Sequence, residues 1–509
     1  MNTSSIVVLV TIVAYLCMMV VIGFKFSKTN ETVDDFYLGG RKLGPFVTAM
    51  SAEASDMSSW LLMGLPGVAY LTGICDAFWT AVGLAIGTWI NWLVVSKRIR
   101  RYSHRIDAIT IPDFFSKRYK DEKNILSCIS ALVILIFFIP YTASGFAACG
   151  KLFRSLFHMD YHQAMILCAI IIVIYTTLGG FLAASTTDLI QSIVMTIALV
   201  VVLGYGTVQA GGWGAVVDNA KSLAGYLSLT NKYDVATGAA VSGGGILTTI
   251  STLAWGLGYF GMPHILLRFM ATEDEQKLTM SRRIATVWVV ISMGISIVIG
   301  MVGLGMSKAG VLPVLEGANS ETVIVEIANL LRSHGVFPAL IAGVILAGIL
   351  AATMSTSDSQ LLAASSSVSQ NILSDFFRVK MSNRTSVIVA RVTVLVISII
   401  SVFIAWNPNS SVFNIVSFAW AGFGAAFGPV VLLALFWKRS NLAGAFSGMI
   451  AGGIMVFLWK YVISGLGGIF AIYELLPAFL VALLVNVVVS LCTKEPDKEI
   501  QDIFEEVRG

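Results

Sequence analysis

Residues 52–67 read AEASDMSSWLLMGLPG and lie inside a hydrophobic run that extends from 46 to 72. A continuous helix in lipid satisfies its own backbone, so glycine and proline at membrane depth indicate that the helix is interrupted. A second such stretch, WGLGYFGMPH at 255–264, lies inside the run 243–268. Paired interruptions in two halves of a chain are typical of inverted-repeat transporters with a site near the bilayer midplane. Helix packing through small residues explains the same pattern, so both interpretations stay open at this point.

The composition of the whole chain is that of a membrane protein. Of 509 residues 57% are hydrophobic and only 12% are charged, and the mean hydropathy is +0.84. An average soluble protein is about a quarter charged. The net charge is +4, and no basic block carries interleaved aromatic residues, so the chain is predicted not to bind nucleic acid. P-loop, G-x-S-x-G and C-x-x-C motifs are absent from the sequence, which argues against an enzyme and against a bound cofactor.

Thirteen hydrophobic runs are long enough to cross about 30 Å of hydrocarbon as helices. They are 5–25, 46–72, 75–96, 126–150, 163–180, 186–209, 243–268, 285–306, 337–372, 386–406, 411–437, 441–463 and 469–493. The sequence therefore predicts an all-α integral membrane protein with about 13 transmembrane helices. Each interrupted run opens a set of five, and two sets of five inserted in succession have opposite orientations.

The expected organisation has five parts. Residues 1–45 form a first span and a cytoplasmic linker, 46–209 a first five-helix repeat, and 210–242 an external loop. Residues 243–437 form a second, inverted five-helix repeat, and 438–509 form two further spans with a cytoplasmic tail. Within the external parts, 321–332 has apolar residues at helical spacing and predicts an amphipathic helix. The charged tail from 495 is expected to be a solvated terminus.

The distribution of positive charge sets the predicted orientation in the cell membrane. With the N-terminus outside and the C-terminus in the cytoplasm, 26 of the 33 Lys and Arg residues fall on the cytoplasmic side. Lys28 and Arg268 are counted among them. Because cytoplasmic loops carry an excess of Lys and Arg, the opposite orientation is rejected.

Four acidic residues lie in or at the edges of the predicted spans: Glu53, Asp56, Asp188 and Asp358. Acids inside a membrane are costly, so each is a candidate functional residue. Each also has a plainer interpretation, as an acid at a water interface or one paired with a neighbouring helix. The plainer interpretation weighs most for Asp188, since a carboxylate near a helix N-terminus is favourable in itself.

The ninth run carries a stripe of hydroxyl groups. Ala352, Ser355, Thr356 and Ser359 share one helical face, and Asp358 borders it. Sodium is a hard cation that prefers oxygen ligands, so this stripe beside an interrupted helix is a candidate sodium site. Alternatively the hydroxyls bond back to their own helix and the small residues serve packing.

Five motifs together resemble the solute:sodium symporter family, and within it the proline carriers. They are LGGR at 38–41, SDMS at 55–58, WLLMGLPG at 60–67, WGLGYFGMPHILLRF at 255–269 and AWAGFGAAFGPVVL at 419–432, and the likeness runs over essentially the whole chain. The resemblance implies sodium-coupled uptake of L-proline by alternating access, with Na+ as the coupling ion and no other cofactor. The expected surroundings are a lipid bilayer, with no obligatory protein partner. A symporter for another small carboxylate-bearing solute, or a sodium channel, are the alternatives.

The resemblance also implies particular site residues. For sodium they are the carbonyls of Ala54, Met57 and Ala352 and the hydroxyls of Ser355 and Thr356. Asp56 matches an acid needed for sodium coupling, and Arg41 matches a functionally sensitive arginine in the cytoplasmic approach. Some family members bind a second cation, and Asp188, Ser355, Asp358 and Ser359 occupy comparable places. Asp358 stands where serine is more usual, which leaves the stoichiometry open. For proline the matching positions are Ser58, Trp60 to Gly64, Tyr141, Trp255, Tyr259 and Pro263.

Overall fold

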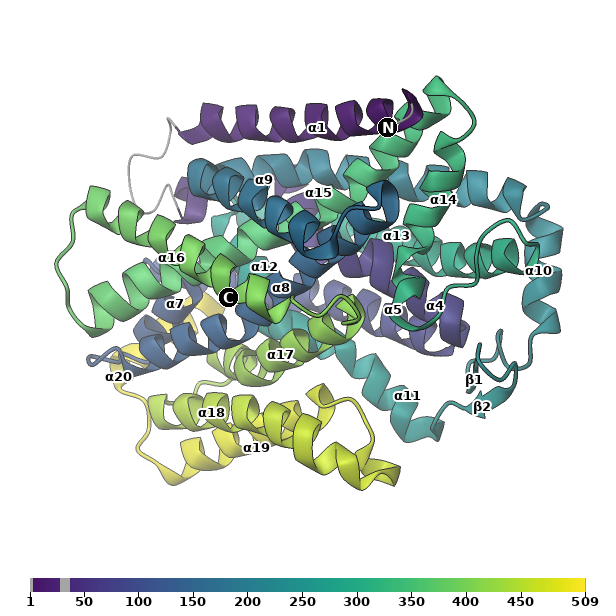
Figure 1. The fold of residues 1–509 in the computed structure, drawn as a ribbon. Coiled ribbons are helices and arrows are strands. Elements are labelled where there is room, and N and C mark those ends of the chain that lie inside the picture. Colours follow the sequence, from purple (N-terminus) through teal and green to yellow (C-terminus); the bar gives the residue numbers. More distant parts are fainter. Residues whose placement is uncertain (1–2, 28–36, 509) are drawn as a thin grey trace.

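The structure of the chain, a computed structural model, describes residues 3–27 and 37–508, so Lys28 lies outside the described residues. The chain is almost entirely helical (Figure 1). Its first half comprises α1 (Thr3–Ser27), α3 (Pro45–Asp56), α4 (Leu65–Thr72), α5 (Ile74–Ile90), α6 (Ser96–Arg105), α7 (Ile111–Arg118), α8 (Ile125–Phe157) and α9 (Tyr161–Gln209). The remainder comprises α10 (Trp213–Ser222), α11 (Gly245–Leu253), α12 (Pro263–Ala271), α13 (Leu278–Lys308), α14 (Val323–Arg332), α15 (Val336–Ser366), α16 (Asn383–Ile404), α17 (Val412–Phe436), α18 (Leu442–Leu458), α19 (Leu475–Cys492) and α20 (Lys498–Arg508).

The helices confirm a multi-pass α-helical membrane protein. Among the described residues, ten helical segments are long and apolar enough to cross a membrane, and Trp60–Thr72 and Tyr161–Ile174 are shorter apolar helices. All thirteen predicted runs overlap helices, but the number of crossings stays a prediction. The predicted runs 163–180 and 186–209 both lie in α9, which consists of two helices joined at a kink at Gly180, where φ is 70° and ψ is −175°.

The first predicted interruption is confirmed, a few residues earlier than its glycine and proline. Helix α3 ends at Asp56, and Met57 leaves the helical conformation with φ −73° and ψ 68°. A turn of π-helix at Trp60–Gly64 then leads into α4. Pro66 is the second residue of α4, directly after this π-helical turn. The break is therefore at Met57 and Ser58, since Ser59 is helical again.

The second predicted interruption is confirmed as well. A 3-10 helix at Ala254–Gly261 follows α11, and Met262 is extended before α12 begins at Pro263. Helix α5 lies directly against this segment: a Cβ on Gly87 would come within 2.4 Å of the Cα of Gly256. The two backbones touch because neither residue carries a side chain.

The described parts outside the spans have structure of their own. An antiparallel hairpin pairs β1 (Asn231–Tyr233) with β2 (Ala240–Ser242), with Lys232 opposite Val241. The predicted amphipathic helix at 321–332 is confirmed as α14, which follows a 3-10 turn at Gly317–Thr322 and buries Val323, Ile324 and Ile327. In Figure 1 the hairpin and α20 lie at opposite ends of the molecule.

The expectation of a solvated C-terminal tail is wrong. Residues 498–508 form α20, which buries Ile500, Phe504 and Val507. The Phe504 ring lies 5.5 Å from the guanidinium of Arg118, itself only 1% exposed. The charged residues of the tail contact neighbouring elements, as in the Lys120–Glu499 and Arg105–Glu506 ion pairs. One apolar face of the tail is enough to fold it onto α6 and α7.

Candidate functional site

The predicted sodium ligands meet where α3 ends against the middle of α15. The Ser355 hydroxyl donates to the Ala54 carbonyl at 2.7 Å and lies 3.2 Å from the Ala352 carbonyl, to which the Thr356 hydroxyl also donates. All of these residues are buried, as is Met57 at the break. The bond from Thr356 is the local bond to its own helix that the packing interpretation predicts. The bond from Ser355 joins two separate helices, which packing within one helix does not explain.

Asp56 links the two interrupted spans to each other. Its Oδ2 accepts a hydrogen bond of 2.7 Å from the Tyr259 hydroxyl on the 3-10 segment, and its side chain is fully buried. Tyr259 is held in turn by the π-helical turn at Asn91–Val95, since the Asn91 amide donates to the Tyr259 carbonyl at 3.1 Å. One turn before Asp56, Glu53 accepts a bond of 2.8 Å from the Trp92 indole of the π-helical turn that joins α5 to α6.

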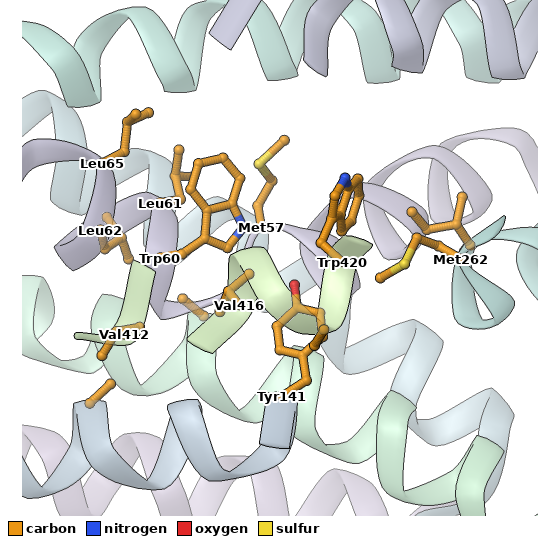
Figure 2. Close-up of a cluster of buried hydrophobic side chains, with 14 of the residues drawn as sticks. Met57, Trp60, Leu61, Leu62, Leu65, Tyr141, Met262, Val412, Val416 and Trp420 are labelled. Carbon is orange, nitrogen blue, oxygen red and sulfur yellow. The ribbon is translucent and has the colours of Figure 1, made fainter. Parts of the chain in front are cut away.

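Four residues predicted for the substrate surround the break in α3. The Trp60 indole and the Tyr141 hydroxyl both donate to the Asp56 carbonyl, at 3.2 and 3.3 Å. The rings of Trp60 and Trp255 have centroids 6.3 Å apart. Figure 2 shows Trp60 and Tyr141 among buried apolar side chains, close to Trp420. Trp60, Tyr141, Trp255 and Tyr259 therefore form one aromatic group beside Asp56, in which Tyr259 bonds to the Asp56 carboxylate and Trp255 contacts the Trp60 ring.

Trp420 belongs to this aromatic group but was not among the predicted site residues. Its indole donates to the Trp255 carbonyl at 2.7 Å, and its ring meets that of Tyr259 edge-on at 5.0 Å. It lies in the AWAGFGAAFGPVVL motif, which gave the only sequence signal for it.

The remaining predicted substrate positions lie at the edges of the group. Ser58 is buried in the break and its hydroxyl accepts from the Trp60 backbone N–H. Gly64 faces Phe413 of α17, where an added Cβ would lie 3.2 Å from the Cβ of Phe413. Pro263 is the buried first residue of α12.

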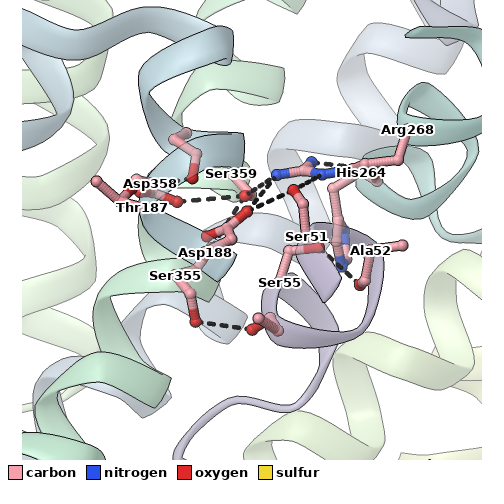
Figure 3. A network of polar contacts seen from close by, with 12 residues as sticks. Ser51, Ala52, Ser55, Thr187, Asp188, His264, Arg268, Ser355, Asp358 and Ser359 are labelled. Carbon is pink, nitrogen blue, oxygen red and sulfur yellow. Dashed lines mark hydrogen bonds and ion pairs between the residues drawn. The ribbon is translucent and has the colours of Figure 1, made fainter. Parts of the chain in front are cut away.

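The acids considered for a second cation, Asp188 and Asp358, lie in a polar network that adjoins the proposed sodium ligands, since the Ser359 hydroxyl donates to the Ser355 carbonyl at 2.9 Å (Figure 3). Asp188 Oδ2 lies 3.1 Å from Nη2 of Arg268 and accepts a 2.6 Å bond from the Ser51 hydroxyl. The same Nη2 donates to the Ser359 hydroxyl at 2.5 Å, and Ser359 lies 3.2 Å from Oδ1 of Asp358. Arg268 was counted among the charges of the cytoplasmic segments, and the structure shows its side chain buried inside the protein, with 1% exposed. Loop arginines and buried arginines look alike in a charge count.

Arg41 lies shortly before α3 in the chain and joins three segments. Its guanidinium donates to the carbonyls of Met270 and Ala108, at 3.0 and 2.7 Å, and approaches the Ser103 carbonyl at 3.4 Å. It thus ties the end of α12 to the connection between α6 and α7.

A second buried ion pair, not predicted from the sequence, lies beyond the other end of the interrupted span. Lys151 of α8 pairs with Glu321 at 2.6 Å, and both side chains are buried. Glu321 also accepts from the Ser411 hydroxyl and from the backbone N–H groups of Val412 and Phe413. Its backbone meets α4, where a Cβ on Gly67 would come within 2.9 Å of the Glu321 nitrogen.

Comparison with known proteins gives a consistent result. A model of the sodium:solute symporter family matches residues 36–452. The chain is 40% identical over 502 residues to the osmoregulated proline transporter OpuE of Bacillus subtilis, covering 98% of both chains. It is also 40% identical over 511 residues to a sodium/proline symporter of Staphylococcus aureus, covering 98% of this chain and 95% of that protein.

Two solved structures share the fold. A Na+-coupled sialic acid symporter in a substrate-bound, outward-open state superposes with a TM-score of 0.78 at 19% identity, over 97% of this chain and 99% of the other. MHP1, a nucleobase-cation-symport-1 family transporter in a closed conformation, gives 0.53 at 14% identity, over 93% and 98%. These likenesses show the inverted-repeat transporter fold with discontinuous helices that the sequence predicted.

Proposed function

The chain belongs to the sodium:solute symporter family, and on that premise we propose that it couples the inward movement of sodium to the uptake of L-proline. It is a transporter and not an enzyme. We propose the cell membrane as its location, with the N-terminus outside and the C-terminus in the cytoplasm. Residues 46–209 and 243–437 are the proposed repeats.

One observation supports the proposal more than any other: the Ser355 hydroxyl reaches the Ala54 carbonyl across two helices at 2.7 Å. Ala54 lies three residues before the break, where backbone oxygens are released from the helical ladder. Carbonyl and hydroxyl oxygens are the ligands that a hard monovalent cation prefers. A sodium ion held by Ala54, Met57, Ala352, Ser355 and Thr356 would bind α3 to α15 without any carboxylate.

The contacts of Asp56 suggest how ion and substrate are coupled. Asp56 lies between Ala54 and Met57 in the chain, and its carbonyl holds both Trp60 and Tyr141. An ion that fixes the backbone at 54–57 therefore also fixes two aromatic side chains of the proposed substrate site. Aromatic faces suit the apolar ring of proline, while unwound backbone groups meet its carboxylate and secondary ammonium.

The energetics are sufficient for accumulation. One positive charge moving inward through 100 mV gains about 2.3 kcal/mol. Since proline is net neutral, one sodium ion supports roughly a fifty-fold proline gradient before its own concentration gradient is added. Transport is therefore expected to be electrogenic.

The test is uptake of labelled proline into proteoliposomes, with an inward sodium gradient or with choline in its place. Ser355→Ala and Thr356→Ala should each raise the sodium concentration for half-maximal uptake about tenfold, equivalent to about 1.4 kcal/mol of lost binding. Ser366→Ala is the matched control, because this buried hydroxyl of α15 bonds to the Ala363 carbonyl of its own helix. Equal uptake in choline, with no cation gradient able to drive it, would contradict the proposal.

Substrate identity needs a separate measurement. Trp255→Ala should weaken proline binding far more than sodium binding, and equal weakening of both would indicate a folding defect. Competition of labelled proline with a panel of other small carboxylates identifies any better substrate. A sodium current that is recorded without proline and is unaffected by adding it would indicate a channel.

A further inference from the structure

Tyr473 comes late in the chain but lies against one of the proposed substrate residues. It lies shortly before α19 begins at Leu475, and α18 and α19 pack beside α17, outside the two proposed repeats (Figure 1). Its ring stacks on that of Trp255, with centroids 5.2 Å apart and planes 21° from parallel. Among the ring contacts of Trp255 in the described part of the chain, this one is the most nearly parallel. The rings of Trp60, Phe413 and Trp420 are inclined to Trp255 by 36°, 40° and 30°.

Two hydrogen bonds hold Tyr473 in place. Its hydroxyl donates to the Ser417 carbonyl of α17 at 2.7 Å, and its backbone N–H donates to the Ser251 hydroxyl of α11 at 2.6 Å. Trp255 lies in the 3-10 segment that directly follows α11. Both bonds therefore attach Tyr473 to elements of the second proposed repeat, and they fix its ring relative to Trp255.

The residues next to Tyr473 are anchored as well. Lys460 Nζ lies 3.2 Å from a carboxylate oxygen of Glu474, whose side chain is buried. Leu475 packs closely on α17, where a Cβ on Gly424 would come within 2.7 Å of Leu475 Cδ1. The close approach of α19 to α17 thus keeps Tyr473 beside Trp255.

The orientation of Trp255 matters for the proposed ligand. An aromatic side chain binds an apolar ring through its face, so the plane of the indole decides whether proline fits. A ring stacked on one face of an indole restricts its side-chain torsions and leaves the other face for a ligand. Tyr473 is the residue in stacking position on Trp255.

We propose that Tyr473 is a positioning residue of the proline site, which holds the Trp255 indole in the orientation that accepts the apolar ring of proline. The inference rests on the proposed function. It also gives the C-terminal spans, which belong to neither repeat, a part in substrate binding. The hydrogen bonds and the stacking contact of Tyr473 are made with residues other than the proposed sodium ligands, so sodium binding should not depend on it directly.

The test is uptake of labelled proline into proteoliposomes, with proline varied at saturating sodium and sodium varied at saturating proline. Tyr473→Ala should raise the proline concentration for half-maximal uptake about tenfold, the upper range for the loss of an aromatic contact, and leave half-saturating sodium close to the wild-type value. Tyr473→Phe keeps the ring and loses the bond to Ser417, so it should stay within about threefold of the wild type. Tyr461→Ala is the matched control, because Tyr461 is 70% exposed and its ring contacts Phe418 and Phe457 instead of Trp255.

A double variant tests whether Tyr473 acts through Trp255. Two residues that act through one contact show non-additive effects. In a Trp255→Ala background, Tyr473→Ala should therefore weaken proline binding little further, as measured by competition with labelled proline. Fully additive losses would overturn the inference, and so would Tyr473→Ala with unchanged half-saturating proline. Equal losses in Tyr473→Phe and Tyr473→Ala would assign the effect to the hydroxyl bond and overturn it too.

Two further outcomes remain decidable. If Tyr473→Ala does not fold, Tyr473→Leu replaces it, because leucine keeps an apolar side chain but has no flat ring; the same selective loss of proline affinity supports the inference, and wild-type affinity overturns it. Wild-type protein that takes up no proline would refute the proposed function. The Tyr473 variants are then compared with the carboxylate of the competition panel that evokes a sodium-dependent current, and a selective loss of affinity for that solute supports the role of Tyr473.

Discussion

Both ion pairs at the ends of the first interrupted span are buried, but the charge at the centre is negative in one and positive in the other. Near Gly67, the centre is the carboxylate of Glu321, which accepts from Lys151, from Ser411 and from two backbone N–H groups of α17. Near Ser51, the centre is the guanidinium of Arg268, which donates to oxygens of α3, α9, α12 and α15.

The difference indicates whether a metal ion could replace the charged group at the centre of each pair. The Glu321 carboxylate is surrounded by hydrogen-bond donors. It stabilises the N-terminus of α17, and these donors leave no place for a metal ion. A cation surrounded only by acceptors occupies a shell that a metal ion could also use. Ion substitution is therefore expected at the Arg268 end alone.

The largest expected effect is at the Glu321 end. Glu321→Ala leaves Lys151 buried without its partner and removes the acceptor of two N–H groups, so stability should fall by about 3–5 kcal/mol. Thermal unfolding of the detergent-purified protein measures this, with Glu321→Gln as the milder control. The loss should be the same in sodium and in potassium media. If sodium restored the stability of Glu321→Ala, the two ends of the span would not differ in their response to the ion.

The next effect is at the Arg268 end and depends on the medium. In potassium, Arg268→Gln leaves Asp188 without a counter-charge and should cost about 3 kcal/mol. In sodium, part of the loss should be recovered, because the ion can bind the vacated oxygens. The measurement is the difference in unfolding temperature between the two media, compared with the same difference for the wild type. No recovery in sodium would argue that the two pairs are equivalent.

A smaller change separates the Arg268 network from the sodium site itself. Ser51→Ala removes the hydroxyl that bridges Arg268 and Asp188 and should cost about 1 kcal/mol of stability, the typical value of one hydrogen bond. Because Arg268 and Asp188 remain in direct contact, half-saturating sodium should change far less than in Ser355→Ala. Sodium-dependent uptake by Ser51→Ala and Ser355→Ala, measured side by side, tests this ranking. An equal change in half-saturating sodium in both variants would indicate that the two groups of residues act as one site.

The smallest effect is expected for an exposed ion pair of the same chemistry. The hydrogen bond from Arg105 lowers the pKa of Glu506 on α20. The resulting stabilisation is present above the pKa of an unfolded glutamate, about 4.3, and disappears as the pH falls through the lowered value. Glu506→Gln should therefore change unfolding only slightly at neutral pH, and high salt should remove even that difference. A large shift that persists in salt would show that burial is not what separates this pair from the other two.

Local sequence was sufficient for the features whose cause is local. Glycine and proline in 60–67 and 255–264 predicted both interruptions, because backbone hydrogen bonding within the helix is a matter of neighbouring residues. The hydroxyl stripe at 352–359 was visible from helical spacing. The family resemblance supplied the aromatic residues, which spacing alone could not distinguish from packing.

Features created by distant contacts were not predictable in this way. The bonds of Glu321 to Val412 and Phe413 join residues about ninety positions apart, and no residue near Glu321 in the sequence predicts them. Arg268 lies at the end of a span, where its sequence neighbours suit a loop charge as well as a buried one. The α20 helix did leave a signal, the i, i+4, i+7 spacing of Ile500, Phe504 and Val507, which its high charge obscured.

The contacts of α20 have a consequence for protein quality control. This helix covers Arg118, whose guanidinium lies over the rings of Tyr102, Tyr119 and Phe504. A chain cut before Lys498 would expose an aromatic and cationic patch around Arg118, which quality-control proteases and chaperones could recognise.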